Sequence, residues 1–595
     1  MSISPEMKRV ALTAAGTAVV ALAAAHLYGP AEQAIKKGLV DNPEQVGKPA
    51  KANTEVHFNE INESSFTYDF IIIGGGTAGS VLASRLSERS DFKVLLLEAG
   101  TSGLNLQISQ VPGAYGQIIR SEHDWGLRTT PQAGCDNREL FWTRAKLLGG
   151  CSSSNAMMFH YGAPSDYDEW GTVTNEPECK EWRFDRFLKY FQKFETFHPH
   201  PDFPVDESKR GKQGPVQTGF YGHFGNIARA FVSTCRSIGI PFNPDFNTTE
   251  GTLGVSKIMT YITSSLSRWP MSQKYCLRES ELWELNLHET KDAPKYRAKI
   301  RKEVILSAGA VHTPHILMNS GIGPIDELNK HNIHVVQDLP GVGDHLMDHP
   351  MSMLRLRTRP GEGSLSFLNK KVNNSPFARL KRSKAIAQYL LMKSGPLTTN
   401  IAEAACFFRS DDPKLFPGLS PLDEDSSSGR NAPDLEIIVM PVAFKNHGAE
   451  PVPEGDLMSI GTIALRPTSV GKITLRSSDP FEPPIIDPNY LSTHHDVDVL
   501  IRTTKAPELD LKLLGVDDET LAKEVRARVD TIYHPTSTAR IGSVVDARLR
   551  VYGLEGLRIA DCSVIPTIIS GHTEAPALAI GEKAADIIKS AYPGV

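Results

Sequence analysis

The strongest constraint on the fold is a glycine-rich turn between two apolar runs in TYDFIIIGGGTAGSVLASRLSERSDFKVLLLEAG, which starts at Thr67. Residues 68–73 form an apolar run typical of a strand that is buried on both faces. Residues 80–87 are predicted to form a helix, and residues 93–97 a second buried strand. Strand, helix and strand in this order predict a parallel sheet of the α/β class.

The turn itself has the spacing GxGxxG at Gly74, Gly76 and Gly79. Glycines here allow a tight turn and a close approach of the backbone to a pyrophosphate, which the amides at the helix N-terminus then bind. Glu98 follows Gly79 by 19 residues, where a carboxylate can accept hydrogen bonds from a ribose and disfavours a 2′-phosphate. The segment therefore predicts a site for NAD or FAD, built from Gly74, Gly76, Thr77, Ala78, Gly79, Glu98 and Ala99.

Length and composition limit the class of protein further. A chain of 595 residues predicts two or more lobes, and a net charge of -5 is small enough to indicate no nucleic-acid partner. The seven cysteines show no CxxC spacing, so we expect neither a metal site nor a disulfide scaffold. The basic run ARLKRSKA at residues 378–385 is interpreted as a solvated helix face.

An uncharged segment near the N-terminus indicates a membrane or secretory route. Residues 10–28 carry no formal charge over 19 residues if His26 is neutral, and they follow Lys8 and Arg9. A bilayer span needs about 17–25 residues, so the segment is either a membrane anchor or a signal peptide cleaved after small residues. Both interpretations predict a membrane-anchored or secretory location. The sequons at Asn62, Asn247 and Asn373 are compatible with glycosylation on that route.

Five further blocks occur in a fixed order along the chain. TRAKLLGGCSSSNAMMFHYGAPSDYDEW starts at Thr143, and GAVHTPHILMNSGIG starts at Gly309. LPGVGDHLMDHP, GKITLRSSDPFEPPIIDPNYL and the C-terminal histidine segments follow. Together they resemble the glucose-methanol-choline (GMC) oxidoreductases, a family of flavoproteins. The resemblance starts at about Tyr68, reaches the C-terminus and implies FAD as the cofactor.

The resemblance also implies a two-lobe fold. A Rossmann-like α/β lobe binds FAD, and a second, α+β lobe with a mostly antiparallel sheet binds the substrate. The alternating run GKITLR suits such an antiparallel strand. The expected divisions are an N-terminal anchor or signal with its linker at 1–65, the FAD-binding lobe at 66–350 with an excursion near 160–215, the substrate lobe at 351–529, and a return to the FAD lobe at 530–595.

Two histidines near the C-terminus are the expected catalytic residues. His534 lies in DTIYHPTSTARIG and His572 in TIISGHTEAPALAIG, and the resemblance places both at the reactive edge of the flavin. An alcohol gives up hydride to flavin N5 readily only as its hydroxyl proton leaves, so a histidine base lowers the barrier. We favour His534 as the base and His572 as the group that orients the hydroxyl, although the sequence leaves their order open.

The resemblance extends the cofactor site beyond the glycine-rich turn. The loop around Gly150 passes close to the flavin, and amides near Thr573 are expected to reach the C2 oxygen of the ring. The additional residues expected to contact FAD are Trp142, Gly150, Asn155, Ala156, Met157, Met158, Asp561 and Thr573.

The sequence departs from the family pattern in two ways that bear on function. Cys151 replaces a small residue beside the expected flavin site, and the stretch from Met271 to Lys302 is shorter than expected and lacks a strand at the adenine end. The leading interpretation is FAD-dependent oxidation of an alcohol, with an apolar secondary metabolite such as a terpenoid or polyketide as substrate. A hydroxynitrile lyase with an idle flavin and a flavin-poor, non-catalytic paralogue are the alternatives. Oxygen and a quinone both stay open as electron acceptors.

Overall fold

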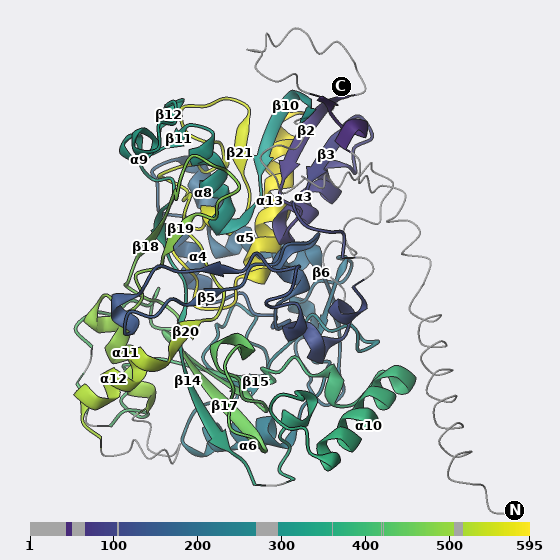
Figure 1. The fold of residues 1–595 in the computed structure, drawn as a ribbon, viewed down its shortest axis with the longest axis vertical. Coiled ribbons are helices and arrows are strands. Elements are labelled where there is room, and N and C mark those ends of the chain that lie inside the picture. Colours follow the sequence, from purple (N-terminus) through teal and green to yellow (C-terminus); the bar gives the residue numbers. More distant parts are fainter. Residues whose placement is uncertain are drawn as a thin grey trace, which may run out of the picture.

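The computed structural model describes residues 43–49 and 66–594, with gaps at 104–105, 269–295, 360, 418, 421 and 505–515. Two sheets organise the described residues into two lobes (Figure 1). The predicted anchor at 10–28 and the short stretch before Tyr296 lie outside the described residues. In the part of the chain that is described, no helix has the length and apolar character needed to cross a bilayer.

The first lobe is built on a parallel sheet whose strands come from the start, the middle and the end of the chain. The strand order is β21 (Leu557–Ile559), β10 (Lys299–Leu306), β2 (Thr67–Ile73) and β3 (Val94–Leu97), and every neighbouring pair is parallel. Helices α3 (Thr77–Leu86) and α13 (Glu574–Ala591) pack against each other. The predicted α/β class of this lobe is confirmed, and its two strands lie within a residue of their predicted positions.

Helix α3 begins at Thr77, three residues before the predicted start at Ser80, because Gly79 belongs to its first turn. A Cβ on Gly79 would lie 1.9 Å from the carbonyl oxygen of Gly74. The glycine therefore allows the helix to start directly against the turn, where a larger residue would force the two apart.

The second lobe contains an antiparallel sheet of six strands among the described residues. Their order is β20 (Val529–Thr531), β14 (Pro350–Arg357), β17 (Leu457–Ala464), β16 (Leu435–Met440), β15 (Ala404–Phe408) and β8 (Gly254–Lys257). Helix α6 (Asn226–Ser237) packs against β8, β15 and β16. The chain thus contributes β8 to this sheet well before residue 351 and well after the expected excursion at 160–215.

Smaller sheets and further helices complete the described fold. The run GKITLR forms β18 (Gly471–Thr474) as an antiparallel strand between β13 (Asp344–Leu346) and β19 (Ile485–Asp487). The remaining strands are β1 (Lys48–Pro49), β4 (Leu127–Arg128), β5 (Phe141–Trp142), β6 (Glu195–His198), β7 (Val216–Gly219), β9 (Tyr296–Arg297), β11 (Ile322–Gly323) and β12 (Gln337–Asp338). The remaining α-helices are α4 (Pro164–Trp170), α5 (Phe184–Phe194), α8 (Gly309–Asn319), α9 (Ile325–Lys330), α10 (Pro376–Met392), α11 (His494–Thr504) and α12 (Asp518–Arg528).

The structure contradicts glycosylation at one of the three sequons. The Asn247 side chain is buried, its amide donates to the carbonyl of Phe159 at 3.1 Å, and its oxygen accepts from the amide of Tyr161 at 3.2 Å. A glycan there would require this packing to open, so the expectation is wrong at Asn247. Asn62 lies outside the described residues.

Candidate active site

A cavity of about 1580 Å³ extends from the carboxyl ends of the parallel strands to the face of the antiparallel sheet. The first side is marked by Ile73 and Leu97, the last residues of β2 and β3, and the second by Met351 and Ile438. Ligands of open α/β sheets bind at the carboxyl ends of the strands. The predicted site residues that line the cavity are Gly74, Gly76, Thr77, Ala78, Glu98, Ala99, Gly150, Asn155, Ala156, Met157, Met158, His534, Asp561, His572 and Thr573.

The glycine-rich turn forms a backbone-lined cradle of the kind that binds a pyrophosphate. Gly74 has φ +105° and Gly150 has φ +53°, a region that disfavours side chains. A Cβ on Gly150 would lie 2.7 Å from the Cα of Gly76, so the two loops approach as closely as backbone allows. Gly76 itself faces the cavity at the N-terminus of α3, where amides and the helix dipole favour an anion.

Glu98 is positioned beside this cradle by the backbone on either side of it. Its two oxygens accept hydrogen bonds from the amides of Gly75 at 2.9 Å and Gly100 at 2.8 Å. Burial raises the pKa of the carboxyl above its usual value, while these amide bonds oppose the rise. Each oxygen has a further lone pair, so Glu98 can accept a ribose hydroxyl from the cavity. These residues fit the phosphates and ribose of FAD.

Two further predicted residues hold the loops around the cavity in place. Asp561 accepts hydrogen bonds from the amide of Gly309 at 2.9 Å and the hydroxyl of Thr313 at 2.7 Å, which ties the end of β21 to α8. Asn155 accepts from the amide of Met157 at 3.0 Å and donates to Glu574. Both residues line the cavity and fix the backbone that would face the flavin.

Gly79 and Trp142 are the predicted cofactor residues that do not line the cavity. Gly79 serves the turn through its contact with Gly74, as described above. Trp142 is buried in the core, where its ring centre lies 6.4 Å from that of Tyr490. Its position immediately before the flavin loop in the sequence does not bring its side chain to the cavity, because β5 directs it toward the packed interior.

The two predicted histidines lie together at the far end of the cavity. His534 follows β20, and His572 precedes α13. Their ring centres are 4.9 Å apart and the ring planes are perpendicular. Residues 38 positions apart in the chain therefore present two imidazoles to the same space between the lobes.

A buried third histidine determines which nitrogen of His534 carries the proton. His349 Nε2 lies 3.0 Å from the carbonyl oxygen of Ile569, and a carbonyl can only accept. His349 Nδ1 is then an acceptor, and it lies 2.9 Å from His534 Nδ1. His534 must carry its proton on Nδ1, which leaves the Nε2 lone pair free to take a proton.

The backbone and pKa of His534 favour the same role. Its amide donates to the buried carboxylate of Asp348 at 2.7 Å. Burial lowers the pKa of His534 well below its usual value, and the neighbouring His572 and His349 lower it further. The imidazole is therefore neutral near neutral pH, as a proton acceptor must be.

His572 is oriented by an acid on the antiparallel sheet. Its Nε2 lies 3.0 Å from an oxygen of Glu436, a fully buried residue of β16. A carboxylate only accepts, so His572 carries a proton on Nε2. The second oxygen of Glu436 is buried and has no hydrogen-bond partner among the described residues. The Glu436–His572 pair links the second lobe to the site.

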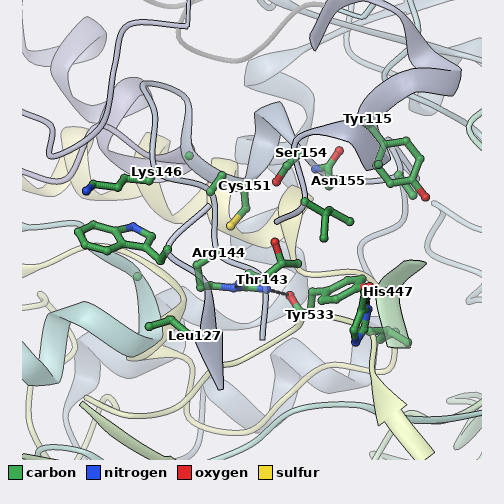
Figure 2. Close-up of a pocket in the computed structure, with 18 of the residues that line it drawn as sticks. Tyr115, Leu127, Thr143, Arg144, Lys146, Cys151, Ser154, Asn155, His447 and Tyr533 are labelled. Carbon is green, nitrogen blue, oxygen red and sulfur yellow. Dashed lines mark hydrogen bonds between the residues drawn. The ribbon is translucent and has the colours of Figure 1, made fainter. Parts of the chain in front are cut away.

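A second cluster consists of His447, Tyr533 and Asp530, and its first two members line the cavity (Figure 2). His447 Nε2 lies 2.8 Å from an oxygen of Asp530, and its Nδ1 forms a hydrogen bond with the hydroxyl of Tyr533. The guanidinium of Arg144 donates to the carbonyl of Tyr533 at 2.6 Å. The side chain of Cys151 also lines the cavity, as expected from the sequence. Tyr533, directly before His534, is thus fixed on both its side chain and its backbone.

Sequence reasoning missed His349, Glu436 and the His447 cluster. His349 stands in the block LPGVGDHLMDHP, where its neighbour Asp348 was equally visible. Glu436 was detectable as the one charge within the apolar strand LEIIVM, since a buried acid needs a partner. His447 lies in a short loop whose sequence shows no such signal.

The fold and this site define an FAD-dependent oxidoreductase with two lobes. The chain belongs to the GMC oxidoreductase family: residues 68–279 and 284–351 match the N-terminal family model, and residues 467–581 match the C-terminal one. FAD is accordingly its cofactor, and the chain is an enzyme.

Relatives with assigned activities cover nearly the whole chain. Dehydrogenase str4 from Strobilurus tenacellus is 35% identical over 88% of this chain and 94% of its own length. An alcohol dehydrogenase [acceptor] from Pseudomonas putida is 32% identical over 88% of this chain and 95% of its own. The crystal structure of a formate oxidase matches with a TM-score of 0.78 and 28% identity, covering 88% of this chain and 98% of that one.

Proposed function

We propose that this enzyme oxidises an alcohol to a carbonyl compound, with His534 as the base. The observation that carries the proposal is the perpendicular His534–His572 pair at the cavity wall. When bound, FAD supplies the hydride acceptor at N5 of its ring. His534 Nε2 accepts the hydroxyl proton. His572 donates from Nε2 to Glu436, which leaves the lone pair of its Nδ1 to share that proton and so orient the hydroxyl.

The chemistry of the second lobe's wall supports an apolar substrate. The antiparallel sheet and its neighbouring loops contribute a group of apolar side chains here, and the basic residues Lys370, Lys371 and Arg382 line the cavity near α10. The apolar group is Met351, Ile401, Ala402, Ile438, Met440, Val442 and Phe444. The apolar group stabilises hydrocarbon by removing it from water. We therefore propose an apolar alcohol as substrate, of the kind found among terpenoid and polyketide secondary metabolites.

Anaerobic titration of the purified holoenzyme with a panel of alcohols tests this function. Apolar primary and secondary alcohols are expected to bleach the flavin absorbance, and matched polar alcohols of equal length to bleach it more slowly. A hydroxynitrile lyase would cleave cyanohydrins without any bleaching. A non-catalytic paralogue would do neither, so the three functions give three different results.

We further propose that residues 10–28 place the enzyme on a membrane or secretory route. Support comes from the uncharged run and its basic flank at Lys8 and Arg9. An apolar alcohol that partitions into a bilayer would be most concentrated there.

The electron acceptor that completes the catalytic cycle is either oxygen or a quinone. Measuring the rate at which each of them reoxidises the reduced flavin identifies it.

A further inference from the structure

Helix α10 exposes more apolar side chain than any other described element of its length. Of the twelve large hydrophobic residues that are exposed among the described residues, five lie on this helix of 17 residues: Phe377, Leu380, Ile386, Leu391 and Met392. Four of them are 65–70% exposed. Single exposed hydrophobics are ordinary, but such a concentration marks an interaction surface.

Three of the exposed residues form one face of the helix, on the side away from the residues that pack on the body. Phe377, Leu380 and Leu391 follow the spacing i, i+3 and i+14, which keeps them on one side. The inner face consists of Ala378, Ala385 and Tyr389, all buried. In Figure 1 the helix lies at the edge of the second lobe and projects from it. Only a partner outside the described residues can cover the outer face.

Charge around the helix indicates the chemistry of that partner. Residues 370–393 contain no acidic residue and seven basic ones: Lys370, Lys371, Arg379, Lys381, Arg382, Lys384 and Lys393. The whole chain, in contrast, has 69 acidic and 64 basic residues. Basic residues interleaved with apolar ones on one helix face are typical of a surface that binds anionic lipid.

We propose that α10 docks the enzyme on an anionic membrane surface. A second copy of the chain is a poorer partner, because Lys384 lies in the middle of the apolar stripe and a symmetric contact would bring like charges together with no acid nearby. A peptide-binding groove would have to surround the helix, whereas its inner face is already packed against the body. A bilayer needs only the one free face.

The docked helix would bring the cavity to the bilayer. Residues 368–372, which lead directly into α10, line the cavity, and so does Arg382. Arg382 Nε donates to the carbonyl of Phe367 at 2.7 Å, which ties the helix to this rim. Delivery of an apolar alcohol from the lipid into the cavity rests on the proposed function, whereas docking itself does not.

The experiment is flotation of the full-length, FAD-loaded enzyme with vesicles of phosphatidylcholine, with and without phosphatidylserine. One variant carries Phe377→Ser, Leu380→Ser and Leu391→Ser, and a second carries Arg379→Gln, Lys381→Gln and Lys384→Gln. A control variant carries Phe242→Ser, Ile325→Ser and Val336→Ser, which remove exposed hydrophobics elsewhere. Flavin absorbance and oxidation of a water-soluble alcohol report that each variant folds.

Both α10 variants are expected to lower partitioning onto the anionic vesicles by about tenfold or more. The Gln variant loses basic residues that each contribute about 1 kcal/mol near such a surface. The Ser variant loses the apolar side chains that would enter the bilayer. The control variant should bind like the wild type. All variants retain residues 10–28, so any binding through that segment is the same in each. A difference in partitioning between the variants and the wild type therefore reports the contribution of α10. Unchanged partitioning of the α10 variants would overturn the proposal, as would a loss for the Gln variant that is as large on neutral vesicles as on anionic ones. A change from dimer to monomer in light scattering with unchanged partitioning would assign the face to a second copy instead.

Discussion

The Nδ1 atoms of His349 and His534 lie 2.9 Å apart, and this contact decides the proton distribution of the site. One of the two nitrogens must donate and the other accept. The carbonyl of Ile569 accepts a hydrogen bond from His349 Nε2, so His349 Nδ1 carries no proton. His534 Nδ1 is therefore the donor, and His534 Nε2 is free to accept a proton. The base is thus prepared by a residue that lies 185 positions earlier in the chain and does not line the cavity.

Replacing His534 with Ala should slow flavin reduction by ~10²–10⁴-fold, the usual effect of losing a general base. Stopped-flow reduction under anaerobic conditions measures it directly. The flavin content should stay the same, because the pyrophosphate cradle and Glu98 are unaffected. An unchanged reduction rate would remove His534 from the mechanism. The same measurement on His572→Ala tests the orienting role, with a smaller loss expected.

Replacing His349 with Phe should slow flavin reduction by about tenfold, because it leaves Nδ1–H of His534 without its acceptor, at a cost of ~1–3 kcal/mol. His349→Asn keeps an oxygen that can accept this proton and should restore most of the rate. The FAD content of both variants should equal that of the wild type. Equal rates in the Phe and Asn variants would show that His349 only fills space.

The parts of the fold that follow from local pattern could be predicted from the sequence. The strands at 67–73 and 94–97 are apolar runs, and the turn at Gly74 has a spacing with a direct steric meaning. The antiparallel lobe followed from resemblance, since pairs such as β8 with β15 join residues about 150 positions apart without a shared local signal. His349 and Glu436 were missed for the same reason: each acts through a contact across the fold.

The stability of the enzyme should fall below about pH 6.5 because of buried neutral histidines. Burial lowers the pKa of His349 to about 3 and that of His315 to about 4. Between these values and about 6.5 the unfolded chain binds protons that the folded chain does not. The free energy of unfolding is therefore greatest above the pKa of these histidines in the unfolded chain. Below that pKa it falls by ~1.4 kcal/mol per pH unit for each group.

Thermal melts of the wild type and His315→Gln across this pH range test the histidine contribution. The variant should lose less stability on acidification than the wild type, because one of the groups that resists protonation is gone. His334→Gln, at an exposed position, should follow the wild type. If the melting temperatures of all three proteins fall in parallel with pH, His315 does not contribute to the loss of stability in acid.

The full chain, expressed in a eukaryotic host, should stay with the membrane fraction after washes at high salt. Insertion of residues 10–28 resists such washes, whereas an electrostatic contact of α10 is weakened by them. A chain starting at Ser65 should be released by the same wash. Immunoblots of pellet and supernatant give the answer, and intact full-length protein in the unwashed cytosolic supernatant would contradict the anchor.

The last prediction concerns the occupancy of FAD. Gly74, Gly76, Glu98 and the loop at Gly150 line the cavity, so the residues expected to hold the phosphates, ribose and ring are in place. The adenine end is expected to lack a strand from the shortened stretch, which lies largely at residues outside the described ones. Within the described sheet, β3 forms the edge beside Glu98.

Loss of one or two hydrogen bonds of ~0.5–1.5 kcal/mol each weakens the binding of FAD by roughly ten- to a hundredfold. We expect the purified protein to be yellow but only partly loaded, and added FAD to raise both its flavin absorbance and its melting temperature. His534→Ala, which keeps the cradle, should load to the same extent. A folded protein that stays colourless in excess FAD would contradict this prediction, and full loading on purification would show that the adenine end is held by other contacts.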